Sequence, residues 1–292
     1  MINITNSPIE QITFNKKTFL LKRDDLLHPH FSGNKARKFY YFFKNDFPNV
    51  RTLISHGSNQ SNAMYSLSVL AKLKGWKFIY YTNHIPSFLE YNPQGNYKYT
   101  LENDMELIVG DYDFDTIKTN DNTKLFIDEG GAIDEASYGL EILANEISKY
   151  IIENKIDNLK VFLPSGTGTT ALFLQKYLDI EVLTCPCVGD VDYLKQQFTE
   201  LELDESIHPT IIKPHKKYHF GKLYRENYEI YLDLLNQTNI EFDMLYDPVG
   251  WNTLLNMYNN NSVTILYIHQ GGVFGNETML ERYKYKYNKR KP

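Results

Sequence analysis

The order strand, polar loop, helix occurs twice along this chain, and it restricts the folds that the chain can adopt. Residues 52–55 form a short apolar run, a polar loop follows at 56–60, and apolar residues then recur at helical spacing until Gly75. The same order returns with a strand at 160–163 and a helix at 169–177. Each unit therefore predicts a strand whose carboxyl end leads through a loop into a helix.

Three further apolar runs predict strands at 77–81, 181–183 and 263–268. The first two follow directly on the predicted helices, so strands and helices alternate along the chain. Strands separated by helical segments are typical of parallel sheets, because parallel neighbours need a crossover connection. The sequence therefore predicts an α/β protein.

Length, composition and charge exclude several classes of protein. The chain has 292 residues, of which 42% are hydrophobic and 23% charged, so it can bury a substantial core. The net charge of −5 gives no basic face of the kind that nucleic-acid binders carry. Residues 1–10 lack the features of a signal peptide, and no apolar run approaches the roughly 18 to 20 residues that span a bilayer. We expect a cytoplasmic protein with neither a nucleic-acid nor a membrane partner.

The cysteines and histidines do not predict a metal site. Cys185 and Cys187 are the only cysteines, and two thiols make neither a disulfide framework nor a zinc site. We expect both to be reduced core residues. The histidines lack convincing metal-ligand spacing, and His269, at the end of a predicted strand, is expected to be structural. No metal is assigned.

Residues 33–38 carry two lysines in a setting that suggests a bound cofactor. Lys35 follows Gly-Asn directly, and Lys38 comes three residues later, on the same face if the segment is helical. One amine can react with an aldehyde while the other binds a phosphate as a point charge. Pyridoxal 5′-phosphate (PLP) presents both groups. A single lysine is normally a solvated surface charge, so the prediction depends on the pair and its surrounding motif.

Residues 164–170, Pro-Ser-Gly-Thr-Gly-Thr-Thr, lead from a predicted strand into a predicted helix. Glycines permit close backbone approach, hydroxyls donate hydrogen bonds, and a helix N-terminus favours an anion. The segment lacks the Gly-Lys-Ser/Thr ending of a P-loop and the spacing of a dinucleotide-binding fingerprint. Alone it fits a plain tight turn equally well. Together with the lysines it predicts a phosphate site made by Ser165, Gly166, Thr167, Gly168 and Thr169.

Six motifs cover nearly the whole chain. They are Lys-Arg-Asp-Asp-Leu at 22–26, Gly-Asn-Lys-x-Arg-Lys at 33–38, Gln-Ser-Asn at 60–62, Glu-Gly-Gly at 129–131, the loop at 165–170 and Ile-His-Gln-Gly-Gly at 268–272. In type and order they resemble the tryptophan-synthase-β-like (fold type II) PLP enzymes, in the branch of 1-aminocyclopropane-1-carboxylate (ACC) deaminase and D-cysteine desulfhydrase.

The resemblance implies an architecture. Members of this family have two α/β domains with mainly parallel, twisted sheets, and PLP lies in the cleft between the domains. Carried over to this chain, residues 1–38 and 146–292 would form the larger, PLP-binding domain and residues 39–145 the smaller one. The resemblance also implies a homodimer.

The resemblance also implies roles for single residues. Lys35 would form the Schiff base with PLP and act as the catalytic base, while Lys38 would bind the phosphate. Asn62 would meet the ring hydroxyl, and Ser61 would be catalytic, meeting the substrate carboxylate or assisting proton transfer. Ser61 and Asn62 are also good helix N-cap types, which is the alternative interpretation of this pair.

The chain departs from the family at the motif that begins with Asp247. Family members commonly continue Asp-Pro-Val with a tyrosine that faces substrate and a Glu or Thr that approaches the pyridine nitrogen. Gly250 and Trp251 stand in those places here, and the partner of the ring nitrogen stays open, with Thr253 or Asn252 as candidates. Tyr246 is a further phenol close by. Tryptophan is more often a core residue than a substrate contact.

The predicted function is a PLP-dependent lyase or deaminase that acts on a small amino acid by α,β-elimination to a 2-oxo acid and ammonia. D-cysteine, or a related D-amino acid with a β leaving group, is the favoured substrate, because the missing tyrosine and glutamate count against ACC. ACC deamination remains the alternative within the family. A catalytically idle PLP-binding homologue is the alternative from a different class.

Overall fold

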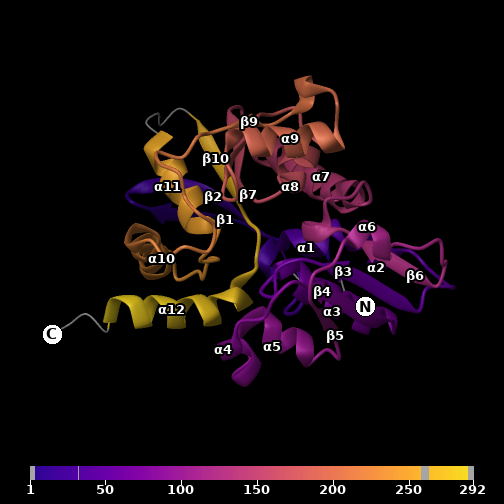
Figure 1. Cartoon of the computed structure of the whole chain (residues 1–292). Helices are drawn as coiled ribbons and strands as arrows, with labels where there is room; N and C mark the ends of the chain where they lie inside the picture. The colour runs from indigo at the N-terminus through magenta and orange to yellow at the C-terminus, as the bar shows by residue number, and fades with distance from the viewer. Residues whose placement is uncertain (1–3, 32, 258–262, 289–292) are drawn as a thin grey trace.

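The computed structural model describes residues 4–31, 33–257 and 263–288, and it contains two separate sheets (Figure 1). The larger sheet has six strands in the order β1-β2-β10-β7-β8-β9, and only the β1–β2 pair is antiparallel. Its strands are β1 (Ile9–Phe14), β2 (Lys17–Arg23), β7 (Leu159–Ser165), β8 (Val182–Pro186), β9 (Thr210–Ile211) and β10 (Thr264–His269). The two ends of the chain therefore meet in one sheet.

The smaller sheet is built from the middle of the chain. Its four strands are all parallel, in the order β5-β4-β3-β6. They are β3 (Thr52–His56), β4 (Lys77–Thr82), β5 (Glu106–Val109) and β6 (Lys124–Ile127). The short helices that accompany this sheet are α4 (Ser87–Tyr91), α5 (Gly95–Leu101) and α6 (Phe114–Ile117), and the long one is α3 (Asn62–Lys74).

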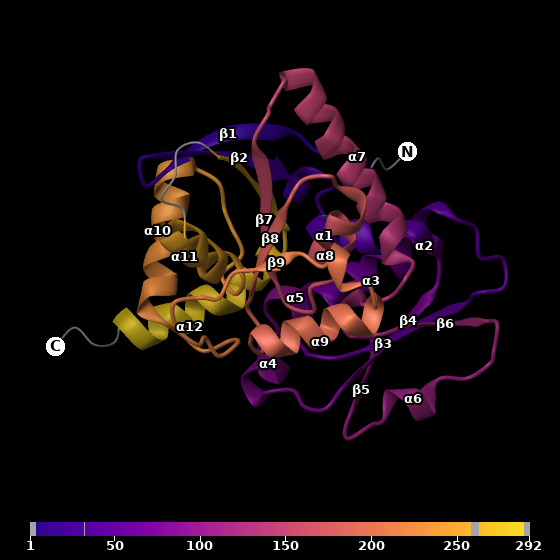
Figure 2. The same ribbon diagram turned by 90° about the horizontal axis from the view of Figure 1, so that it is seen from above.

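Helices cover both faces of the larger sheet (Figure 2). Strand β7 shows why, since Phe162 points into a core with α10 and α11, while Val161 and Leu163 point into a core with α7 and α8. Alternate side chains of a strand leave opposite faces, so a strand that is apolar throughout is covered on both sides. The helices outside the smaller sheet are α1 (Gly33–Lys38), α2 (Tyr40–Lys44), α7 (Ala136–Asn154), α8 (Thr169–Tyr177), α9 (Val191–Leu201), α10 (Arg225–Thr238), α11 (Asp247–Met257) and α12 (Asn276–Asn288).

The α/β prediction is confirmed, with small shifts of the element bounds. The first predicted unit is β3 followed by α3, which ends at Gly75 in the left-handed conformation. In the second unit Pro164 and Ser165 belong to β7 and not to the loop, because both pair with β8. The predicted strand at 181–183 is β8, which begins at Val182 and continues to Pro186.

The predicted domain limits remain a proposal. The division at 145/146 falls inside α7, a continuous helix of 19 residues. We propose instead that the chain crosses back to the larger unit within residues 128–135, before α7 begins, because α7 packs against the larger sheet through Leu140 and Leu143. Across the described residues every helix is too short or too polar to span a bilayer.

A buried network of charges joins the segments at the start of the fold. Arg37 of α1 is fully buried, pairs with Asp24 at 2.8 Å and donates two hydrogen bonds of 2.8 Å to Glu146 of α7. Lys22 of β2 reaches the same Glu146 at 2.7 Å and donates to Ser7 O at 2.6 Å. Burial lowers the pKa of Arg37, but the two carboxylates outweigh burial and hold this pKa above its usual value. The network fixes α1 against β2 and α7.

We predict that Arg37→Met destabilises the protein by about 3–5 kcal/mol, because it leaves Asp24 and Glu146 buried without their cation. The free energy of unfolding from urea denaturation measures the effect. Arg225→Met is the matched control, since Arg225 pairs with Glu229 in the open with its side chain 79% exposed. This control should change stability by no more than about 0.5 kcal/mol. Equal effects of the two substitutions would contradict the role given to the network.

Candidate active site

The carboxyl ends of β7 and β10 hold the helix that carries the two lysines. Asn34 donates its backbone N–H to Gln270 O at 3.1 Å and its side-chain amide to Gln270 Oε1 at 3.0 Å. Gln270 in turn donates to Pro164 O at 2.7 Å. At Gly33 the backbone is left-handed (φ +65°), and a Cβ there would lie 1.9 Å from Gln270 O. Only glycine fits this contact, which seats α1 on the ends of two strands.

Both lysines of α1 converge on one backbone oxygen. The Nζ atoms of Lys35 and Lys38 donate to Gly130 O at 2.8 and 3.0 Å. Burial lowers the pKa of Lys35 from 10.5 to about 8, although Lys38 and the carboxylate of Glu129 act in the opposite direction. Burial and the neighbouring Lys35 bring the pKa of Lys38 well below its usual value. Lys35 is therefore an amine that is partly neutral near physiological pH.

The predicted phosphate loop lies beside the same turn. The side chain of Thr167 comes within 3.3 Å of a Cβ built on Gly130, so the loop and the two lysines contact one residue. Gly168 has a left-handed backbone (φ +75°) that turns the chain into α8. The first N–H groups of α8 have no acceptor within the helix, as at any helix N-terminus. Thr170, in the first turn, has a buried hydroxyl without a hydrogen-bond partner.

The two residues of the predicted pair have different surroundings: Ser61 caps α3, whereas Asn62 lines the candidate site. Ser61 is the N-cap of α3, and its hydroxyl accepts from Ala63 N and Met64 N. Asn62 accepts a hydrogen bond of 2.6 Å from Asn96, and its amide nitrogen would lie 2.4 Å from a Cβ on Gly272. The capping interpretation of Ser61 is therefore realised, while its catalytic role stays a prediction.

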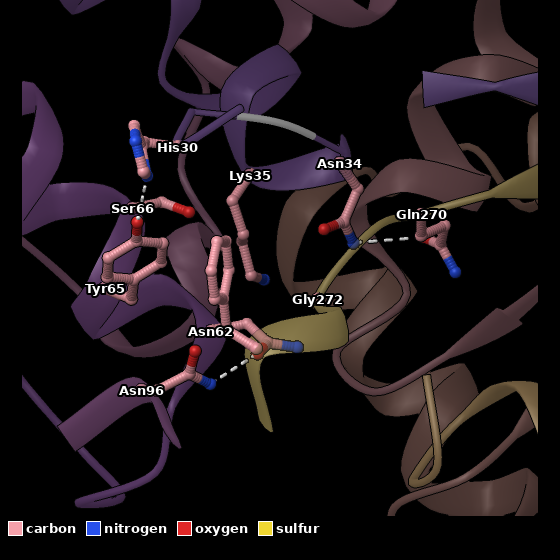
Figure 3. Close-up of a pocket in the computed structure, with 10 residues that line it drawn as sticks. His30, Asn34, Lys35, Asn62, Tyr65, Ser66, Asn96, Gln270 and Gly272 are labelled. Atoms are coloured by element: carbon pink, nitrogen blue, oxygen red, sulfur yellow. Dashed lines mark hydrogen bonds between the residues drawn. The ribbon is translucent and has the colours of Figure 1, made fainter. Parts of the chain in front are cut away.

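A pocket lies between α1 and the residues that follow β10 on one side and α3 and α5 on the other. Figure 3 shows Lys35 projecting into it towards Asn62, with the hydrogen bonds of Asn34 to Gln270 and of Asn96 to Asn62 at its edges. Tyr65 and His30 form one wall, and the hydroxyl of Tyr65 lies 3.0 Å from Nδ1 of His30. The full lining is His30, Asn34, Lys35, Asn62, Tyr65, Ser66, Asn96, Gln270, Gly272 and Phe274.

Of the predicted residues, Lys35 and Asn62 line this pocket, whereas Lys38, Ser61 and the 165–169 loop do not. Lys38 and the loop join the site through Gly130, as described above. Sequence reasoning missed Tyr65 and Asn96 as lining residues. The helical spacing of Tyr65 from Asn62 was an available signal for the first, because residues three apart share a helix face. No local pattern marks Asn96, which reaches the site only through the packing of α5 on α3.

Gly250 and Trp251, the two residues of α11 that depart from the family motif, are both explained by core packing. Trp251 is fully buried, stacks on Tyr267 with ring centroids 4.2 Å apart, and meets the rings of Phe14 and Phe19 edge-on. A Cβ on Gly250 would lie 2.8 Å from the hydroxyl of Tyr267. Neither position therefore presents a side chain to the pocket, and the expectation that Trp251 fills core is confirmed.

The hydroxyl of Thr253, a candidate partner of the ring nitrogen, is engaged within α11. Its hydroxyl donates to Val249 O at 2.8 Å within the buried face of α11. His269 is structural, as expected, since it is fully buried with Nε2 2.8 Å from Glu241 O and Nδ1 accepting from Gly271 N. Both cysteines are free and buried. The described residues contain no group of three or more side chains that could hold a metal ion.

Comparison with solved structures places the chain in a known fold. A structure described as the ACC deaminase homologue aligns with a TM-score of 0.80 and 20% identity over 98% of this chain and 95% of that chain. A hydrogen sulfide-producing enzyme from Fusobacterium nucleatum aligns at 0.62 and 12% over 92% and 95%, and the diaminopropionate ammonia lyase of Escherichia coli at 0.65 and 12% over 98% and 87%. The chain therefore has the two-sheet fold that the resemblance predicted. At these identities the likeness concerns the fold.

No protein-family model matches the chain, and no curated protein matches its sequence.

We predict that Gly33→Ala destabilises the protein more than Gly75→Ala, measured as the free energy of unfolding in urea. Both glycines have left-handed backbones, with φ of +65° and +68°, so both substitutions carry the same backbone cost of about 1–2 kcal/mol. Only the Cβ at Gly33 meets another atom, since nothing lies within 4 Å of a Cβ at Gly75. The clash should add about 1–3 kcal/mol. Equal losses in the two variants would show that the contact with Gln270 is not tight.

We predict that Lys35 reacts with a small amine-directed reagent with a rate that rises through pH 8 and then levels off. With a pKa of about 8, about a tenth of the amine is neutral at pH 7 and about half at pH 8. Peptide mass spectrometry after short labelling at a series of pH values measures this rate, with the exposed Lys149 as internal reference. A Lys35 rate that keeps rising in parallel with Lys149 to pH 10 would contradict the lowered pKa.

Proposed function

We propose that this protein is a PLP-dependent lyase that eliminates a β substituent from a small amino acid. The observation that carries the proposal is the pair of amines, those of the partly buried Lys35 and the buried Lys38, which share Gly130 O beside the 165–169 loop. Within the described residues neither lysine pairs with a carboxylate, although Lys38 is 2% exposed. Burial without an anion disfavours the charged form of Lys38, and a bound phosphate would favour that form again.

The residues of the site fit the separate parts of PLP. Lys35 would take the aldehyde carbon, since its lowered pKa supplies the neutral amine that attack requires. Lys38, the hydroxyls of Thr167 and Thr169 and the free N–H groups of α8 would hold the phosphate. The unpartnered hydroxyl of Thr170 supports the same placement. Asn62, which lines the pocket opposite Lys35, would contact the ring edge.

The chemistry follows from Lys35 once the substrate amine has replaced it. PLP, when bound, would supply the electron sink for the bond broken at the substrate Cα. The amine of Lys35 would accept the Cα proton, the bond from Cβ to the leaving group would break with its electron pair on that group, and the amine would pass the proton to the departing group. Ser61, at the start of α3, is proposed to meet the substrate carboxylate with its hydroxyl proton. The released enamine would hydrolyse to a 2-oxo acid and ammonia.

D-cysteine, or a related D-amino acid with a β leaving group, is the proposed substrate, giving pyruvate, ammonia and sulfide. Gly250 supports this choice, since it faces Tyr267 and Pro164 and leaves no room for the tyrosine associated with ACC ring opening. The structural similarity to a hydrogen sulfide-producing enzyme is compatible with it. ACC deamination is the alternative. A homodimer in the cytoplasm, implied by the family resemblance, is part of the same proposal.

The absence of the family's tyrosine and Glu or Thr at positions 250 and 251 also supports a second candidate from another class, an idle PLP-binding protein. Such a protein would retain Lys35, Lys38 and the phosphate loop but would not turn over an amino acid. The two candidates differ only in the fate of an added substrate.

We predict that protein purified with PLP has a visible absorption band that Lys35→Ala abolishes, because this variant lacks the amine that attaches the aldehyde. Addition of D-cysteine should perturb the band and release pyruvate and sulfide, while L-cysteine and ACC should do neither. Lys149→Ala, which removes an exposed lysine of α7, is the matched control and should keep the band. Spectrophotometry together with a 2-oxo acid assay measures both outcomes.

Each other result has a definite meaning. A Lys35-dependent band that no amino acid perturbs would favour the idle binder, and perturbation by ACC with release of a 2-oxo acid would favour ACC deaminase. No band in the unaltered protein would refute PLP binding.

A further inference from the structure

Tyr246 lies immediately before α11, with its ring against the phosphate loop. A Cβ built on Gly166 would be 3.4 Å from Cε1 of Tyr246 and 3.6 Å from its hydroxyl oxygen. No other polar side chain comes within 4 Å of that point among the three nearest contacts. The phenol of Tyr246 is therefore placed at the end of β7, where the loop begins.

The position of this ring is fixed on several sides. Tyr246 N donates to Asp243 Oδ1 at 2.6 Å, and Tyr246 O accepts from Gly250 N at 3.0 Å in the first turn of α11. The ring packs against Phe220, with centroids 5.2 Å apart. A tyrosine held at its backbone and ring has little freedom to turn its hydroxyl elsewhere.

The hydroxyl of Tyr246 is available to a ligand. Among the hydrogen bonds of the described residues Tyr246 takes part through its backbone N and O and not through its hydroxyl. Its side chain is only half-buried. Burial, together with the nearby Asp243 and Cys187, raises the pKa of Tyr246 above its usual value. The phenol is therefore a neutral donor at physiological pH.

The other candidates for the open position are occupied or remote. Thr253 donates to Val249 O, and the hydroxyl of Ser165 is paired with Thr184 at 2.6 Å. Asn252 has an unpartnered amide nitrogen, but no contact brings it to the loop.

We propose that Tyr246 donates a hydrogen bond to the pyridine nitrogen of bound PLP, in place of the family's Glu or Thr, whose position holds Trp251 here. The proposal rests on the PLP site proposed above. On the pyridine ring the nitrogen lies opposite the carbon that bears the aldehyde. The phosphate arm is attached to the ring carbon next to that one. With Lys35 at the aldehyde and residues 165–169 at the phosphate, the nitrogen would lie on the side of the ring away from Lys35. The contact of Tyr246 with Gly166, the first glycine of the loop, is the observation that would place its phenol on that side.

The proposal also narrows the substrate class. A neutral phenol leaves the pyridine nitrogen unprotonated, whereas a carboxylate partner favours the protonated ring. An unprotonated ring withdraws electrons less strongly. This suits β-substituted amino acids with a good leaving group, such as a thiolate, better than a cyclopropane.

The test is the nitrogen-15 NMR shift of PLP labelled at the ring nitrogen and bound to the protein without substrate. The shift in the unaltered protein should be that of a neutral, hydrogen-bonded pyridine, and in Tyr246→Phe it should move towards that of a free pyridine. Binding of PLP should weaken about 3- to 10-fold through loss of one neutral hydrogen bond. Tyr193→Phe is the matched control, because it removes a nearby phenol on α9 and should leave the shift unchanged.

Three results would overturn the proposal: an unchanged shift in Tyr246→Phe, a shift that responds to Tyr193→Phe instead, or a protonated ring in the unaltered protein. These outcomes are separate from failure of the proposed function, which would appear as the absence of a Lys35-dependent visible band. A band with an unchanged nitrogen shift in Tyr246→Phe would leave the PLP site intact and refute only the role of Tyr246.

Discussion

The buried guanidinium of Arg37 organises the structure around the site. It joins Asp24, which follows β2, to Glu146 in the middle of α7, and Lys22 completes the same network from β2. Because a buried charge is tolerated only with its partners in place, these segments have one relative arrangement of low energy. Helix α1 is part of that arrangement, so the network also sets the position of Lys35, two residues from Arg37. Electrostatics in the core thereby fixes the geometry at the pocket.

Gly130 is the second point on which the site depends. Its carbonyl oxygen accepts from both lysines, and a Cβ built on it would lie 3.3 Å from the side chain of Thr167 in the phosphate loop. The turn Glu129–Gly131 follows β6 of the smaller sheet, whereas the loop follows β7 of the larger one. One turn therefore brings the two sheets together at the two amines. Among the described residues Glu129 acts on Lys35 from a distance, but no carboxylate forms an ion pair with either amine, which supports the proposed phosphate site.

Packing in the core also explains Gly250 and Trp251, the residues of α11 that differ from the family motif. Trp251 is the centre of an aromatic cluster with Tyr267 and Phe14. Gly250 leaves space for the hydroxyl of Tyr267, which donates to Asp247 at 2.7 Å. Core packing thus accounts for both residues without any contact with a ligand. Tyr246, one residue before α11, is the polar group that remains at this end of β7, and the inference about the ring nitrogen follows from its position.

The sequence by itself determined the local structure and the residue types of the site. Apolar runs and helical spacing located β3, α3, β7 and α8 to within a few residues, because the apolar pattern of a strand or helix depends on residues that are close together in the sequence. Lys35 and the 165–169 loop were also recognisable, since each is a compact motif. Only the tertiary structure showed that Arg37, in the same motif as Lys35, is buried against a carboxylate 109 residues away. It alone decided that Ser61 caps α3, that Trp251 lies in the core and that Tyr246 reaches Gly166. These outcomes depend on contacts between distant segments, which a linear pattern does not encode.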